Sequence, residues 1–132
     1  MNLAIIPKYA ALLAVLFLIL SVRTLSLRRK HRIGVGDGGN LVLKRAARAH
    51  ANFSEYVPLA ILLLAFCETW AAPGALIHGA GASLLLGRVL HAYGISQPEE
   101  DLRFRVSGMA LTFGSIAIAI GFLCFHGFIS QA

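Results

Sequence analysis

The chain has 132 residues, of which 58% are hydrophobic and 14% are charged, and its mean hydropathy is +0.74. This composition excludes an ordinary soluble globular domain, which could not bury so much apolar surface. A helix that crosses a bilayer needs about 20 mostly apolar residues. Four such spans with short connections use nearly the whole chain. We therefore predict one domain over residues 1–132, an all-α integral membrane protein that forms a four-transmembrane-helix bundle.

Basic residues are concentrated in one part of the chain. The formal net charge is +6, and eight of the twelve lysines and arginines lie between Arg23 and Arg48. A basic cluster beside a membrane span is typical of a cytoplasmic flank, where anionic membrane lipids are the nearest partners. Because these residues are not spread along exposed faces, the sequence argues against nucleic acid as a partner.

The first predicted helix spans about residues 5–27 and is followed by a loop over 28–42. Its basic cluster comes after the apolar run, whereas a signal peptide carries such residues before it. We expect a retained helix whose N-terminus lies outside the cytoplasm. The loop is rich in glycine, which favours turns, and lacks the Lys-Ser or Lys-Thr pair that completes a phosphate-binding loop.

The remaining predicted helices span about residues 43–70, 75–95 and 106–125, with a second polar loop over 96–105 on the side of the first. Pro58 lies inside the second helix, where a kink can open a pocket between helices. The cysteines fall in apolar runs, away from any metal-ligand spacing. Small residues recur three or four apart and predict close helix packing; they are Gly79, Ser83 and Gly87 in one helix and Ser107, Ala110, Gly114, Ala117 and Gly121 in the next.

A polar stripe marks the second helix. At about 100° per residue, its members fall within one sector of the helix surface; they are Arg45, Arg48, Asn52, Glu55 and Tyr56. Charged groups in a membrane are costly and usually functional. One alternative is that Arg48 and Glu55 only join helices or subunits. The excess of arginines over the single Glu55 instead favours an anionic ligand.

These residues carry a family resemblance. The segment Arg48-Ala-His50-Ala-Asn52-Phe-Ser-Glu55-Tyr56-Val-Pro58 resembles the signature of the MAPEG family, the membrane-associated proteins in eicosanoid and glutathione metabolism. Gly87-Arg88-Val-Leu-His91 and the four-helix length extend the resemblance, and the short glycine-rich loop is most similar to bacterial members. The resemblance implies a homotrimer in a bacterial inner membrane, with glutathione bound between subunits in a cytoplasm-facing cleft.

The resemblance also implies roles for individual residues. A cationic residue beside the glutathione thiol would favour the thiolate that attacks a lipophilic electrophile or peroxide, and either Arg103 or Arg105 is our candidate for this catalytic role. At the end of the first helix, Arg23 and Arg28 both fit the family pattern, and we rank Arg28 first. The expected glutathione-binding residues are Arg48, Asn52, Glu55, Tyr56, Arg28, Arg88 and His91.

Three functions remain open from the sequence. The first is a glutathione transferase or peroxidase acting on lipophilic small molecules, whose ligand has carboxylates to match the arginines and an ammonium to match Glu55. The second is a catalytically silent MAPEG-like assembly protein, because Ile95 stands where the eicosanoid enzymes have a tyrosine. The third is a small proton-coupled multidrug exporter that uses Glu55, although the adjacent arginines disfavour a cation site.

Overall fold

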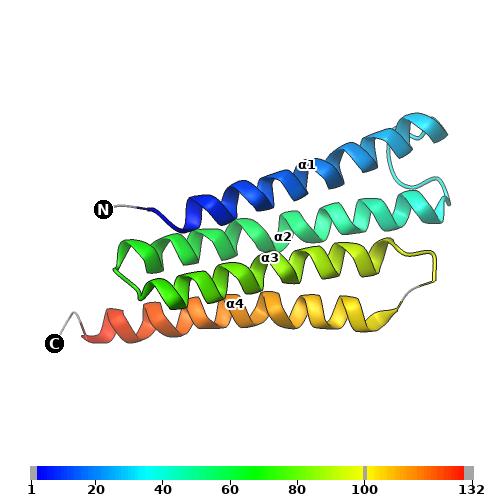
Figure 1. The fold of residues 1–132 in the computed structure, drawn as a ribbon. Helices are drawn as coiled ribbons and strands as arrows, with labels where there is room; N and C mark the ends of the chain where they lie inside the picture. The colour runs from blue at the N-terminus through cyan, green and yellow to red at the C-terminus, as the bar shows by residue number, and fades with distance from the viewer. Residues whose placement is uncertain (1–2, 100, 130–132) are drawn as a thin grey trace.

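The computed structural model describes residues 3–99 and 101–129, which form four antiparallel α-helices (Figure 1). They are α1 (Ile6–His31), α2 (Leu41–Thr69), α3 (Gly74–Ser96) and α4 (Leu102–Ile129). Each is long and apolar enough to cross a membrane, α4 over Leu102–Gly127. The predicted all-α bundle of four transmembrane helices is confirmed.

Two helices extend further into the polar segments than the sequence predicts. α1 continues to His31 through residues expected in the loop, because basic side chains are favourable at the negative end of a helix dipole. α4 begins at Leu102 because the carboxylate of Asp101 accepts the backbone N–H of Arg103 at 2.9 Å. At the start of α2, the side chain of Asn40 accepts the N–H of Leu43, also at 2.9 Å.

α3 and α4 pack backbone to backbone at a pair of glycines. A Cβ atom added at Gly108 would lie 2.6 Å from the carbonyl oxygen of Gly87 and 2.6 Å from the backbone nitrogen of His91. Such distances leave no room for a side chain at Gly108. The close approach of helices predicted at Gly87 is therefore confirmed. By contrast, a Cβ atom added at Gly114 or Gly121, in the predicted small-residue row of α4, would meet no side chain and no other helix within 4 Å in the described residues.

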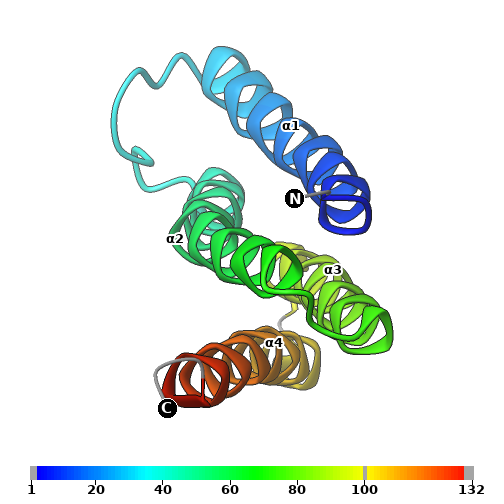
Figure 2. The ribbon, with the colours of Figure 1, turned by 90° about the vertical axis from the view of Figure 1, so that its left-hand side faces the viewer.

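α1 lies at the edge of the bundle, packed on α2 and α3 without touching α4 in the described part of the chain (Figure 2). Only three of its residues, Ile6, Leu13 and Leu20, are buried. Polar contacts fasten it at both ends: the carboxylate of Glu68 accepts backbone N–H groups at the start of α1, and Arg23 donates to the hydroxyl of Ser96 near the other end.

Both polar connections lie at the same end of the bundle, where α1 and α3 finish and α2 and α4 begin (Figure 1). We call this the basic end. It brings the first half of α2, the last half of α3 and the start of α4 together, although they are far apart in sequence. The predicted site residues of these three helices therefore lie in the half of the bundle toward the basic end.

Candidate functional site

The polar stripe of α2 is divided between two environments. Arg48 and Glu55 are exposed, and neither side chain forms a hydrogen bond or ion pair within the described residues. Asn52 and Tyr56 are half-buried and turn toward α3 and α4, since Asn52 accepts a hydrogen bond from Arg88 and the ring of Tyr56 lies 5.6 Å from that of Phe113. One part of the stripe, Asn52 and Tyr56, therefore faces the bundle interior, and another part, Arg48 and Glu55, is exposed on the surface of the chain.

A cavity of about 270 Å³ lies at the basic end between α2, α3 and α4. We call it the basic cavity because its polar side chains are all cationic. Such a lining suits carboxylate or phosphate groups, which arginine binds through paired hydrogen bonds. Its lining residues are Leu41, Lys44, Arg45, Arg48, Ile95 and Arg105.

A second cavity of about 390 Å³ follows α4 further into the bundle. This α4 cavity is mainly apolar, with His91 and Arg105 as its polar groups. Arg105 lines both cavities and so stands between a cationic space and an apolar one. The full lining is His91, Leu102, Arg105, Val106, Met109, Ala110 and Phe113.

Arg88 lies behind the stripe and lines neither cavity. Its side chain is 1% exposed. Its Nη1 atom donates to Oδ1 of Asn52 at 2.8 Å, and its Nε atom donates to Oγ1 of Thr112 at 2.9 Å. Its Nη2 atom contacts the carbonyl of Gly108 at 3.5 Å and the sulfur of Met109 at 3.2 Å. All these partners are neutral groups of the chain itself, and the direct ligand contact expected of Arg88 from the sequence stays a prediction.

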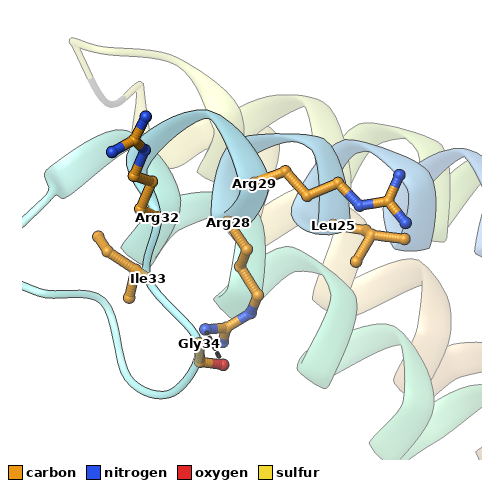
Figure 3. Close-up of a pocket in the computed structure, with 6 residues that line it drawn as sticks. All are labelled: Leu25, Arg28, Arg29, Arg32, Ile33 and Gly34. Atoms are coloured by element: carbon orange, nitrogen blue, oxygen red, sulfur yellow. Dashed lines mark hydrogen bonds between the residues drawn. The ribbon is translucent and has the colours of Figure 1, made fainter.

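The candidate arginines of α1 lie away from both cavities. Arg28 donates to the carbonyl oxygens of Gly34 at 3.2 Å and Gly36 at 2.9 Å, and so holds the glycine-rich loop against the end of α1. Figure 3 shows Arg28 extended toward this loop, whereas Arg29 and Arg32 point in other directions. Within one chain, neither Arg28 nor Arg23 reaches the α2 stripe.

The two candidates for thiol activation differ in position. Arg103 is exposed and lines a shallow cavity with Glu99 and Asp101, whereas Arg105 is half-buried between the basic cavity and the α4 cavity. Sequence reasoning did not single out Lys44 or Thr112. Lys44 lies one residue before the stripe and could have been found by extending it, but nothing in the local pattern marks Thr112 as a partner of Arg88.

Family comparison agrees with the helix arrangement. The model of the MAPEG family matches residues 6–125, which include both cavities and the α2 stripe. The chain belongs to the MAPEG family. It is similar to inner membrane protein YecN of Escherichia coli strain K12, with 38% identity over 112 residues that cover 85% of this chain and 84% of that protein. The protein of the same name from Escherichia coli O6:H1 matches equally well.

The resemblance recognised in the sequence is therefore confirmed, and this MAPEG chain is a multi-pass membrane protein. The described residues contain no group of three histidine, cysteine, aspartate or glutamate side chains placed to hold a metal ion. The polar groups of the two cavities are the guanidinium groups of three arginines, the ammonium group of Lys44 and the imidazole of His91, beside an apolar wall.

Proposed function

We propose that this MAPEG protein binds glutathione at the basic end and uses its thiol against lipophilic electrophiles or peroxides. The observation that carries the proposal is the position of Arg105, which lines both the basic cavity and the α4 cavity. A polar thiol substrate and an apolar partner bound in these adjoining spaces would meet at a guanidinium group.

The charges of the site complement those of glutathione. The tripeptide has two carboxylates and one ammonium group. Lys44, Arg45 and Arg48 would attract the carboxylates, and exposed Glu55 would attract the ammonium. Three cationic side chains beside one carboxylate attract a net-anionic zwitterion and repel a cationic drug, so this pattern favours glutathione.

Arg105 would act on the thiol. A free cysteine thiol has a pKa of about 8.5 and is mostly protonated at neutral pH. A guanidinium within a few ångströms stabilises the thiolate, which is the attacking form. In a conjugation, the thiolate sulfur forms a bond to the electrophilic carbon, and the leaving group departs with the electron pair of the broken bond.

A second copy of the chain would complete the site, and we propose the homotrimer that the family resemblance implies. Three features support an interface: Arg48 and Glu55 are exposed, Gly114 and Gly121 have open space beside them, and the α1 arginines line neither the basic cavity nor the α4 cavity of their own chain. Small residues let helices of different subunits approach closely in lipid. An arginine from a neighbouring α1 could then reach the basic cavity.

We further propose that the basic end faces the cytoplasm of a bacterial cell. Support comes from the lysines and arginines gathered at this end of the helices, in and beside the two connections, which follow the positive-inside rule. The related Escherichia coli protein is named an inner membrane protein. Glutathione would then enter from the cytoplasm and the lipophilic substrate from the bilayer.

The proposal is tested by glutathione turnover of the detergent-purified protein with a panel of lipophilic electrophiles and hydroperoxides. Conjugation or peroxide reduction that is lost in Arg105→Gln and kept in Arg103→Gln supports the proposed enzyme. Glutathione binding without turnover across the panel favours the catalytically silent alternative, which is motivated by the inert Ile95 side chain in the basic cavity. No glutathione binding by the intact oligomer contradicts both.

A further inference from the structure

Arg88 is the largest fully buried side chain in the described part of the protein, and it is charged. A buried cation is usually matched by a carboxylate, because an uncompensated charge is costly to desolvate. Here the partners are an amide oxygen, a hydroxyl, a carbonyl and a thioether. A buried guanidinium with only neutral partners suggests that the hydrogen bonds donated by Arg88 have a function.

The bond to Asn52 sets the orientation of that side chain. A guanidinium group can only donate hydrogen bonds, so the atom of Asn52 that faces Arg88 at 2.8 Å must be the amide oxygen. The amide nitrogen is then turned away from Arg88. It has no hydrogen bond in the described residues and is absent from the buried polar atoms that lack a partner, so it remains accessible.

Asn52, which carries this amide nitrogen, shares a face of α2 with the candidate ligand-binding residues Arg48 and Glu55. Asn52 is one helical turn from Arg48, which lines the basic cavity, and Arg88 itself touches Met109, which lines the α4 cavity. Asn52 itself lines neither cavity, but it thus presents a hydrogen-bond donor on the α2 face next to Arg48, within reach of a ligand that extends from the basic cavity along the stripe. If the amide were reversed, it would present an acceptor and repel carbonyl and carboxylate oxygens.

We propose that Arg88 is a positioning residue that fixes Asn52 as a donor, so that the site accepts the carbonyl or carboxylate oxygens of its ligand. The identification of that ligand as glutathione rests on the proposed function, whereas the orientation of Asn52 does not. Arg88 acts through Asn52 and does not itself contact the ligand.

Arginine suits this position better than lysine does. Its Nε atom binds Thr112 on α4 while its Nη1 atom binds Asn52 on α2, so one rigid fork joins three helices. Its Cζ atom lies 5.7 Å from the ring centre of Tyr56, which limits its movement on that side. A lysine would keep the charge but could not hold both partners in this geometry.

The first test is a double-mutant cycle on the glutathione Kd, measured by isothermal titration with wild type, Arg88→Lys, Asn52→Ala and the double variant. We expect Arg88→Lys alone to weaken binding roughly tenfold, the cost of about one well-placed hydrogen bond. In the Asn52→Ala background, the same change should alter the Kd less than about twofold. Arg88→Lys should lower the thermal stability whether or not Asn52 is present, because Arg88 also binds Thr112. An effect on the Kd that requires Asn52 is therefore a positioning effect and not a consequence of lower stability. Equal effects on the Kd in the two backgrounds would overturn the proposal.

The second test does not need glutathione. In protein labelled with ¹⁵N-asparagine, the side-chain NH₂ signals of Asn52 are identified by their loss in Asn52→Ala. We expect Arg88→Lys to shift these signals and to leave those of Asn40, which caps α2, unchanged. Unshifted Asn52 signals would refute the inference, and absent glutathione binding with shifted signals would refute the proposed function alone.

If Arg88→Lys does not fold, Asn52→Asp takes its place. The carboxylate would keep the contact with Arg88 as an ion pair while removing the amide donor. We expect a folded protein with at least tenfold weaker glutathione binding, the effect of losing a donor to a charged group. Wild-type affinity in Asn52→Asp would contradict the proposal.

Discussion

The carboxylate of Glu68 accepts the backbone N–H of Ile5 at 2.6 Å. The same side chain also accepts the N–H groups of Ala4 at 2.7 Å and Ile6 at 2.8 Å, so a residue near the end of α2 caps the start of α1. α1 has no side-chain cap of its own at this end. The exposed donors of its first turn are satisfied from another helix.

This cap should stabilise the docking of α1. We expect Glu68→Ala to lower the free energy of unfolding by roughly 2 kcal/mol, because charge-assisted hydrogen bonds to several backbone donors are lost. Thermal unfolding in detergent measures the change, with Glu99→Ala as a control at an exposed loop carboxylate. Equal melting temperatures for the two variants would show that the cap does not fasten α1.

The glycine contact between α3 and α4 predicts that a methyl group added at Gly108 destabilises the protein, whereas one added at Gly79 does not. Gly108→Ala should destabilise the protein by about 1–3 kcal/mol, because the new Cβ must push the α3 backbone away. Gly79→Ala is the matched control, since its Cβ meets no atom within 4 Å, and it should be neutral or stabilising through higher helix propensity. A tolerated Gly108→Ala would contradict the close crossing.

The open glycines of α4 predict where subunits meet. Gly114→Leu and Gly121→Leu should weaken the proposed trimer, because a bulky side chain prevents close approach between helices. Light scattering in detergent gives the oligomer mass, and Gly79→Leu serves as a control in equally open space. An unchanged mass in both α4 variants would remove this face from the proposed interface.

Arg105 and Arg103 provide a matched pair for testing thiol activation. We expect Arg105→Gln to reduce the thiolate fraction of bound glutathione at neutral pH and to shift its formation to higher pH, because a nearby positive charge favours the ionised form. Arg103→Gln should leave this titration unchanged, since Arg103 lines neither of the two cavities. Ultraviolet absorbance of the thiolate monitors both variants. The reverse ranking would assign the role to Arg103.

The helices were largely predictable from sequence because an apolar run long enough to span a bilayer permits few other structures. The errors fell at charged ends. Residues Arg28 to His31 were expected in a loop, yet their charge favours the end of a helix. The early start of α4 depends on one side chain, Asp101, whose capping role a hydropathy pattern does not reveal.

The candidate site was predictable only in part. Helical periodicity placed Arg48, Asn52 and Glu55 on one face of α2. It could not show that Asn52 turns inward to Arg88, 36 residues away in sequence, or that Arg28 is held by loop carbonyls. Such contacts depend on how helices pack, which local spacing does not determine.

The most direct test of the central claim is isothermal titration of the detergent-purified protein with glutathione. We expect saturable binding, weakened at least about tenfold in Arg48→Ala and in Glu55→Gln by the loss of a charged partner. Lys8→Ala and Glu99→Gln, which change exposed charges outside both cavities, should bind as wild type does. An intact protein that does not bind glutathione, or binding that is indifferent to Arg48 and Glu55, would contradict the account.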